Sequence, residues 1–243
     1  MDYSFLQCGE GALTVHLGDG IDPAINRRVT ALQGAIGSAG LRGITDLIPA
    51  YADLTVCYDC TVISAKALQR QLRRLLDSLS VAGQDRRRVF RLPVCYGGDY
   101  GPDLDFVRHH SGLSAQEVIE LHSAPDYLIY MLGFLPGFAY LGGLDPRLHT
   151  PRLDSPRTCI PAGSVGIGGA QTGVYPLASP GGWQLLGRTP VSVFDRQRQE
   201  PILYRAGDLV HFVPISPAEY EEIARAVAAG TYTVQVEEVP VCD

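Results

Sequence analysis

The chain has 243 residues, of which 46% are hydrophobic and 19% charged, and this length and composition predict a globular protein of one or two domains. A formal net charge of −6 argues against a general nucleic-acid binder, because neutralising phosphates needs clustered cations. No apolar run reaches the roughly 18 residues of a membrane span, and the first residues lack a secretory signal, so we expect a cytoplasmic protein that does not enter a membrane.

Two residue types exclude further classes of chemistry. Lys66 is the only lysine, and its surroundings form no phosphate-binding loop, Schiff-base site or biotin-carrier site. The six cysteines are scattered along the chain, so free thiols are expected. Cys57 and Cys60 form a CxxC pair that no second pair completes, and we therefore expect no metal site.

The first part of the chain alternates predicted strands with predicted helices. One helix begins at Asp22 and Pro23 with apolar residues at spacings of four, three and four, and a second begins after the cap Ser64. Two helices on one face of a mainly antiparallel sheet predict a small α+β domain with a ferredoxin-like arrangement. The predicted strands of this sheet cover residues 12–18, 43–51, 53–59 and 88–96.

The pattern changes near residue 90, and we place the domain boundary so that the α+β domain covers residues 1–88 and the second domain residues 89–243. The basic run that starts at Arg86 is interpreted as a solvated linker, with an anion site as the alternative. Two short helices follow, the second with a capping box that starts at Ser114. Short apolar runs separated by glycine and proline then predict the many short strands of a barrel, with one late helix that starts at Ser216.

A long segment from Tyr130 to Pro190 is dense in glycine and proline. Glycine permits positive φ and close backbone approach, whereas proline fixes φ and removes a donor, so together they prescribe one path for the chain. Generic motifs fail here: Ser164 lacks the first glycine of a G-x-S-x-G nucleophile motif, and no helix after Gly166 completes a dinucleotide fingerprint. The shape of the segment is therefore expected to matter.

Polar side chains in and before this segment are candidates for a ligand site. His122 is a candidate acid or base; the alternative is a helix-terminal histidine that caps carbonyls. Arg157 and Arg188 can bind a carboxylate, and Gln171 with Thr172 can hydrogen-bond an amide, which suits a small acid that carries an amide. The alternative for each of the four is a structural role in tying down long loops.

Aromatic residues in the same segment allow two interpretations. They form either the wall of a ligand pocket or the core of the barrel. These residues are Phe134, Phe138, Tyr140, Tyr175 and Trp183.

Three stretches resemble one known family over nearly the whole chain. They read LPVCYGGDYGPDLDFV, HSAPDYLIYMLGFLPGFAYLGGLD and SPRTCIPAGSVGIGGAQTGVYPLASPGGWQLLGRTP. They are similar to the B subunit of bacterial 5-oxoprolinase, also known as the KipI or allophanate hydrolase subunit 1 family. The resemblance implies a cyclophilin-like β-barrel after the α+β domain.

The same resemblance implies work in a complex that uses ATP to open 5-oxoproline, a cyclic amide, to glutamate. This chain would pair with the C subunit of 5-oxoprolinase and act with the A subunit, and ATP would be handled by a partner, since the chain has no phosphate loop. The expected catalytic residues are His122, Gln171 and Arg188. The expected substrate-binding residues are Arg157, Ser164, Thr172, Tyr175 and Trp183.

Two other outcomes of the resemblance stay open. The architecture also resembles a protein that inhibits a sporulation histidine kinase, where the chain is a binding module and not an enzyme. It further resembles a part of biotin-dependent enzymes that act on urea or allophanate, although that part is usually embedded in a much longer polypeptide.

Overall fold

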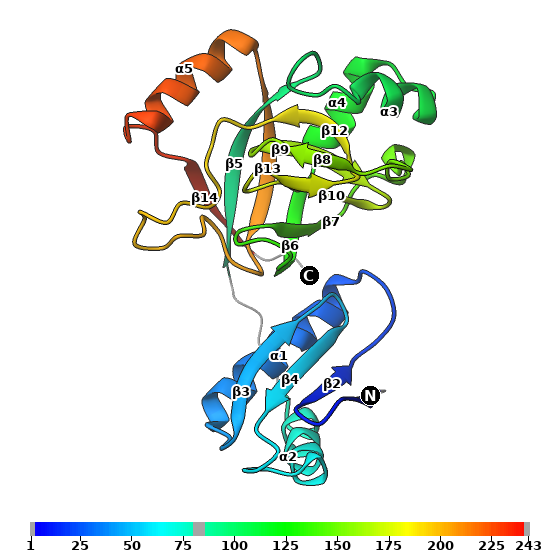
Figure 1. Cartoon of the computed structure of the whole chain (residues 1–243), viewed down its shortest axis with the longest axis vertical. Coiled ribbons are helices and arrows are strands. Elements are labelled where there is room, and N and C mark those ends of the chain that lie inside the picture. Colours follow the sequence, from blue (N-terminus) through cyan, green and yellow to red (C-terminus); the bar gives the residue numbers. More distant parts are fainter. Residues whose placement is uncertain (1–2, 80–85, 241–243) are drawn as a thin grey trace. The chain divides into compact units, whose positions relative to one another are not determined.

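The polypeptide folds into an N-terminal unit, residues 1–84, and a barrel unit, residues 85–243 (Figure 1). The computed structural model describes residues 3–79 and 86–240. Within these ranges, no helix has the length and apolarity that crossing a membrane requires. The five cysteines in the described ranges are free thiols, and Cys242 lies outside them.

The N-terminal unit is a four-stranded antiparallel sheet with two helices. The strands run in the order β1-β2-β4-β3. Leucines and valines of β2 and β4 pack with the apolar stripes of both helices into one core, which includes Leu13, Leu54, Leu32 and Leu72. The elements are β1 (Ser4–Cys8), β2 (Ala12–His16), α1 (Pro23–Ala39), β3 (Ile44–Pro49), β4 (Asp53–Tyr58) and α2 (Ala65–Asp77).

Both helices of this unit begin at the predicted caps. The Asp22 carboxylate accepts a hydrogen bond from the amide of Ala24, and the Ser64 hydroxyl accepts one from the amide of Ala67. α1 ends at Gly40, whose φ of 55° is the left-handed conformation that glycine adopts without steric cost. The local sequence pattern therefore accounts for where the helices start and stop.

The ferredoxin-like arrangement is not confirmed. That arrangement has the element order βαββαβ, whereas this unit has the order ββαββα. The predicted strand over residues 88–96 lies within β5 (Arg86–Tyr96) and belongs to the barrel, where it pairs with β13, β14 and β12. The fourth strand of the N-terminal sheet is instead β1, which was not predicted. Residues 88–96 were assigned to the wrong sheet because an apolar pattern indicates a strand without indicating which strand it pairs with.

The barrel unit contains a closed sheet of seven strands. Their order is β12-β9-β10-β7-β6-β13-β5, and pairing of β12 with β5 closes the barrel. β5 and β13 are parallel while the other neighbours in the barrel are antiparallel. The bounds are β6 (Asp126–Leu132), β7 (Ala139–Gly142), β9 (Ser164–Gly168), β10 (Gln171–Val174), β12 (Gln184–Arg188) and β13 (Leu209–Ile215).

Shorter elements surround the barrel. Figure 1 shows α3 and α4 together at one side of it and α5 at the other. Apolar side chains fill the interior, among them Leu92, Ile129, Val165 and Phe212. The surrounding elements are α3 (Leu104–Ser111), α4 (Ala115–Ser123), a 3-10 turn (Pro146–Leu148), β8 (Arg157–Ile160), β11 (Ser179–Gly181), α5 (Pro217–Ala228) and β14 (Gln235–Pro240).

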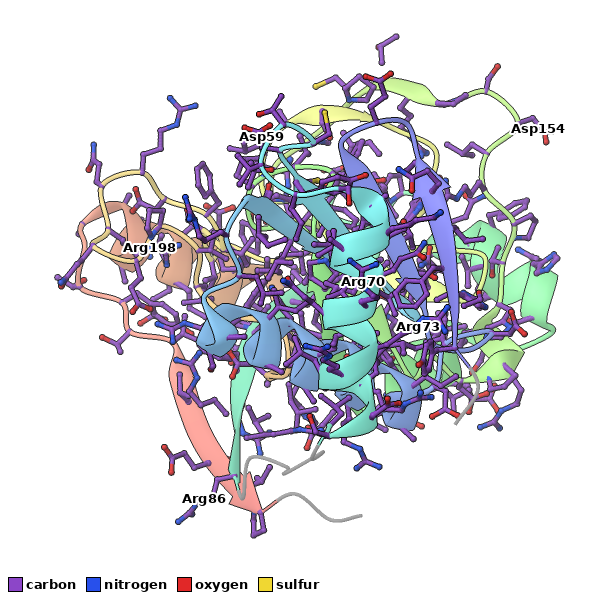
Figure 2. The ribbon with its side chains drawn as sticks, turned by 90° about the horizontal axis from the view of Figure 1, so that it is seen from below. Asp59, Arg70, Arg73, Arg86, Asp154 and Arg198 are labelled. Atoms are coloured by element: carbon purple, nitrogen blue, oxygen red, sulfur yellow. The ribbon has the colours of Figure 1, made fainter. Side chains whose placement is uncertain are left out.

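The basic run at the start of β5 is part of the sheet and not a solvated linker. Arg88 forms a hydrogen-bonded ion pair with Asp208, with 2.6 Å between Nη2 and Oδ2. Arg86 lies opposite Pro240 in the ladder of β5 and β14 and pairs loosely with Glu238 at 3.4 Å. Figure 2 shows Arg86 at this end of the two strands. The acidic residues that neutralise the run come from elsewhere in the chain, so the run alone did not reveal them.

Candidate functional site

His122 lies in the last turn of α4 with its side chain fully buried. Its Nδ1 is 2.8 Å from the hydroxyl of Tyr96, at the end of β5, and its Nε2 is 2.7 Å from Oγ1 of Thr172 on β10. Thr172 Oγ1 in turn lies 3.0 Å from the carbonyl oxygen of Gly166 on β9. The imidazole also stacks on Phe212, with 4.9 Å between ring centroids.

The direction of each hydrogen bond in this chain of groups follows from the backbone carbonyl at its end. A carbonyl only accepts, so the Thr172 hydroxyl donates to Gly166 and accepts from Nε2–H of His122. Nδ1 is then the acceptor for the Tyr96 hydroxyl. Burial lowers the pKa of His122 to about 3, which keeps the ring neutral.

The catalytic role expected for His122 and the substrate-binding role expected for Thr172 stay predictions, and the contacts of the two side chains bear on them. The structure brings the two residues together, but both ring nitrogens of His122 and the hydroxyl proton of Thr172 are engaged by protein groups. Neither does the His122 ring cap the carbonyls of its helix, since its nitrogens face Tyr96 and Thr172. A positioning role, in which α4 is tied to β5 and β10, fits the contacts best.

Asp103 organises a second group of predicted residues. Its carboxylate accepts from the guanidinium of Arg157 and from the backbone amide of Leu185, at 2.6 Å each. Arg157 also donates to the carbonyl of Trp183 at 3.3 Å. Through these contacts Arg157 connects β8 to the start of β12, as expected if the residue has the structural role of tying down long loops. Asp103 was not among the residues predicted from the sequence, although the turn-rich motif GGDYGPD marked its position.

Breaking this ion pair is expected to destabilise the barrel unit. Asp103→Ala removes the acceptor of a buried amide and leaves Arg157 without its carboxylate partner, so the free energy of unfolding should fall by about 2–4 kcal/mol. Urea unfolding of the purified variant measures this value. The matched control is Asp105→Ala, which removes a solvent-exposed pair with Arg108 two residues further along and should leave the midpoint unchanged. Equal midpoints for both variants would contradict the assignment.

Tyr175 and Trp183 belong to a buried aromatic cluster. They are 3% and 4% exposed, and edge-to-face contacts with Phe138 at 5.5 Å join them. A Cβ at Gly168 would overlap the Trp183 indole, so the glycine makes room for the ring. These three rings are therefore core residues, in a cluster separate from the one that fills the barrel, and substrate binding by Tyr175 and Trp183 stays a prediction.

Arg188 ends β12 and remains partly exposed. Its guanidinium lies close to the phenol of Tyr220 on α5, and its positive charge opposes the rise in the pKa of Tyr220 that burial causes. The Tyr220 ring packs 4.5 Å from that of Tyr100, whose hydroxyl donates to Glu221 at 3.1 Å. Ser164, buried at 2% exposure, is the strand partner of Arg188. Polar groups from β12, α5 and the loop after β5 thus meet at this end of the barrel.

Gln171 begins β10, beside the other end of β9. It is partly exposed and pairs with Gly168, whereas Arg188 pairs with Ser164, four residues away along the same strand. At about 3.3 Å per residue the two positions are offset by roughly 13 Å along β9, and they flank this strand on opposite sides. The residues predicted to bind one small acid therefore do not form one cluster. Tyr100 and Tyr220 were not predicted either, since no motif links them to Arg188.

Comparison with known proteins places the chain among named relatives. A family model described as carboxyltransferase domain, subdomain C and D, matches residues 3–204. A protein of Bacillus subtilis (strain 168), named as the B subunit of 5-oxoprolinase, is 42% identical over 228 residues, which cover 90% of this chain and 95% of the relative. A protein of the same name from Escherichia coli O157:H7 is 46% identical over 207 residues, which cover 85% and 93%.

Two solved structures have folds similar to that of this chain. The protein TTHA0988 is 40% identical with a TM-score of 0.74, and the match covers 84% of this chain but 40% of that one. The urea carboxylase of Kluyveromyces lactis has a TM-score of 0.83 over 98% of this chain and 24% of its own, and at 23% identity it supports the fold alone. By its match to the model of carboxyltransferase subdomains C and D and by its relatives, the chain belongs to the family of 5-oxoprolinase B subunits.

Proposed function

We propose that this chain is the B subunit of an ATP-dependent 5-oxoprolinase, a complex that opens 5-oxo-L-proline to L-glutamate and also contains the A and C subunits. The observation that carries the proposal is the 42–46% identity, over 85–90% of the chain, to two proteins named as B subunits of 5-oxoprolinase. In this proposal the barrel is of the cyclophilin-like type, and the chain works in the cytoplasm.

The chemistry explains why such a complex uses ATP. Amide resonance makes the lactam carbon a poor electrophile, and transfer of the γ-phosphoryl group of ATP to the lactam oxygen turns that oxygen into a leaving group. Water then adds to the activated carbon, the C–N bond breaks, and the nitrogen takes up a proton to become the amine, which leaves γ-glutamyl phosphate. A second water hydrolyses this acyl phosphate to the γ-carboxylate of glutamate and inorganic phosphate. Lys66 is the only lysine of the chain and lies outside any phosphate loop, which supports a partner polypeptide as the ATP-binding component.

Within this chain, Arg188 is the best candidate for contact with the substrate. Its guanidinium is partly exposed and lies beside the Tyr220 phenol, so it can bind the carboxylate of 5-oxoproline through charge-assisted hydrogen bonds. Gln171, at the start of β10, remains a candidate to hydrogen-bond the amide of the substrate only if a second polypeptide holds the substrate at this end of the barrel. His122 and Thr172 act through position: they hold α4, β5 and β10 together behind the substrate-facing surface.

Removal of the Arg188 guanidinium is expected to weaken substrate binding. For Arg188→Ala we predict at least a tenfold loss of kcat/KM for 5-oxoproline, carried mainly by KM, in a complex that stays assembled. Steady-state kinetics with size-exclusion chromatography measure both quantities. Arg108→Ala, which removes an exposed guanidinium on α3 paired with Asp105, is the control and should keep the wild-type kcat/KM. Wild-type kinetics of Arg188→Ala would remove this residue from the site.

A substrate panel tests the proposed function against its two alternatives. The purified chain is combined with the purified A and C subunits and ATP, and 5-oxoproline, urea and allophanate are offered in separate reactions. Glutamate formed from 5-oxoproline, with no turnover of the other two, is the expected result. Turnover of urea or allophanate would favour the carboxylase-related alternative. Inhibition of a histidine kinase by the chain, with no glutamate from the mixture, would favour the binding module.

A further inference from the structure

Phe134 combines two features that are unfavourable in the isolated chain. It lies in the loop between β6 and β7 with a φ of 63°, and no other residue except glycine in the described ranges has a positive φ. L-residues with bulky side chains avoid this region because the Cβ approaches the following carbonyl oxygen. The Phe134 side chain is also 65% exposed to solvent.

The loop that carries Phe134 is fixed by its own hydrogen bonds. The amide of Gly133 donates to the carbonyl of Phe138 at 3.2 Å, and the amide of Phe138 donates to the carbonyl of Leu135 at 3.0 Å. The buried hydroxyl of Tyr204 donates to the carbonyl of Gly137 at 3.0 Å. Since both ends of the loop are held, the Phe134 ring is kept at the surface by the conformation of the loop.

The surroundings of Phe134 are apolar. Its ring packs edge-on against Phe138, at 5.6 Å between centroids, and Phe138 belongs to the buried aromatic cluster. Leu135 is partly buried against the same cluster, and Pro136 is exposed beside it. The exposed ring is thus held in place by buried apolar side chains. Aromatic side chains held in this way commonly act as anchors that fill a pocket in another polypeptide.

Exposure alone does not distinguish this residue. Phe106 on α3 is 49% exposed, but it has ordinary helical backbone and stacks on His110 at 6.1 Å. Scattered exposed apolar side chains are common in soluble proteins and require no partner. Phe134 differs because its backbone is strained as well, and strained conformations persist mainly where they serve binding or catalysis.

We propose that Phe134 is an anchor by which the barrel unit binds the C subunit of 5-oxoprolinase, with its ring inserted in an apolar pocket of that partner. This inference rests on the proposed function. A polypeptide occupant is supported by TTHA0988, where the matched region makes up 40% of the chain, so that the counterpart of this chain is covalently joined to further polypeptide.

The test compares Phe134 with Phe106 in the full-length chain. Isothermal titration measures the Kd for the purified C subunit of wild type, Phe134→Ala, Phe134→Gly and Phe106→Ala. Both Phe134 variants should bind at least tenfold more weakly, which corresponds to about 1.4 kcal/mol, and Phe106→Ala should stay within twofold of wild type. The isolated Phe134→Gly variant should unfold at a temperature equal to or above that of wild type, because glycine adopts the positive φ without strain.

Each contrary outcome has its own meaning. Unchanged Kd values for both Phe134 variants would overturn the anchor and leave the proposed function standing. An unchanged Kd with a lowered kcat would place the ring at the substrate and also overturn the anchor. A wild-type chain that does not bind the C subunit contradicts the anchor directly. A wild-type chain that binds the C subunit tightly, but forms no glutamate once the A subunit is also present, contradicts the proposed function alone.

Discussion

We expect Gly101→Ala to remove about 3 kcal/mol from the free energy of unfolding of the barrel unit. A Cβ at this position would overlap the backbone carbonyl of Leu186 and lie 2.8 Å from the amide of Gly187, and backbone cannot move aside as a flexible side chain can. The same β12 segment accepts the amide of Gly97, so a shift there would also break a 2.9 Å hydrogen bond. Thermal unfolding should show a midpoint lowered by about 6–12 °C.

Gly98→Ala is the matched control for this substitution. Gly98 lies in the same loop with a φ of 53°, and a Cβ there would meet no atom within 4 Å. Only the left-handed backbone then opposes the alanine, at about 1 kcal/mol. The two variants therefore separate close approach from conformational preference. A similar loss of stability in both would show that the contact between this loop and β12 is looser than described.

The second large effect is a dependence of stability on pH that His122 causes. Its pKa in the folded chain is lowered to about 3 from an unfolded value of 6.5. Below pH 6.5 the unfolded chain therefore binds a proton that the folded chain does not. The stabilisation is fully present above pH 6.5 and is lost as the pH falls toward 3, by about 1.4 kcal/mol per unit and by about 2 kcal/mol at pH 5.

His122→Gln isolates this contribution from that of other groups. Carboxylates such as Asp145, whose pKa is lowered to about 2 chiefly by hydrogen bonding to Arg147, also weaken the fold in acid, but they are the same in both proteins. Urea unfolding of wild type and variant at pH 7 and at pH 5 gives the difference. The wild type should lose about 2 kcal/mol more than the variant between these values. Equal losses would mean that the His122 ring is not held neutral in the barrel.

Local signals in the sequence predicted much of the secondary structure. Ser114 forms the capping box expected at the start of α4, α5 begins after Ser216 as expected, and Asp22 and Ser64 cap the helices of the N-terminal unit. These features depend on residues two or three positions apart, which a sequence displays directly. The barrel was also predicted, because glycine and proline divide the second unit into short apolar runs.

Pairing between distant segments was the part that local patterns did not determine. The sequence of β5 predicts a strand in either unit, and only pairing with β12, β13 and β14, all of them far later in the chain, assigns it to the barrel. The same limit applies to the site. Asp103 and Arg157 are 54 positions apart, and His122 and Thr172 are 50 apart, so their hydrogen bonds follow from the closed barrel and from no motif.

The glycines between Tyr130 and Pro190 show what the sequence could predict and what it could not. Their density indicated that backbone shape matters, and the structure supplies the reason at particular positions. A Cβ at Gly166 would lie 2.6 Å from the carbonyl oxygen of Gln184, and one at Gly187 would lie 2.6 Å from that of Cys95. These glycines allow β12 to approach β9 and β5 and so to close the barrel. The sequence predicted that glycine was needed without identifying what approaches it.

The role of this chain in the complex is tested most directly by titrating it into fixed amounts of the A and C subunits with ATP and 5-oxoproline, and measuring glutamate. We predict almost no glutamate without the chain, a rise with each addition, and saturation once the chain matches its partners in number. Glutamate formed at the full rate without the chain, or none at any amount of it, would contradict a B subunit that completes the enzyme.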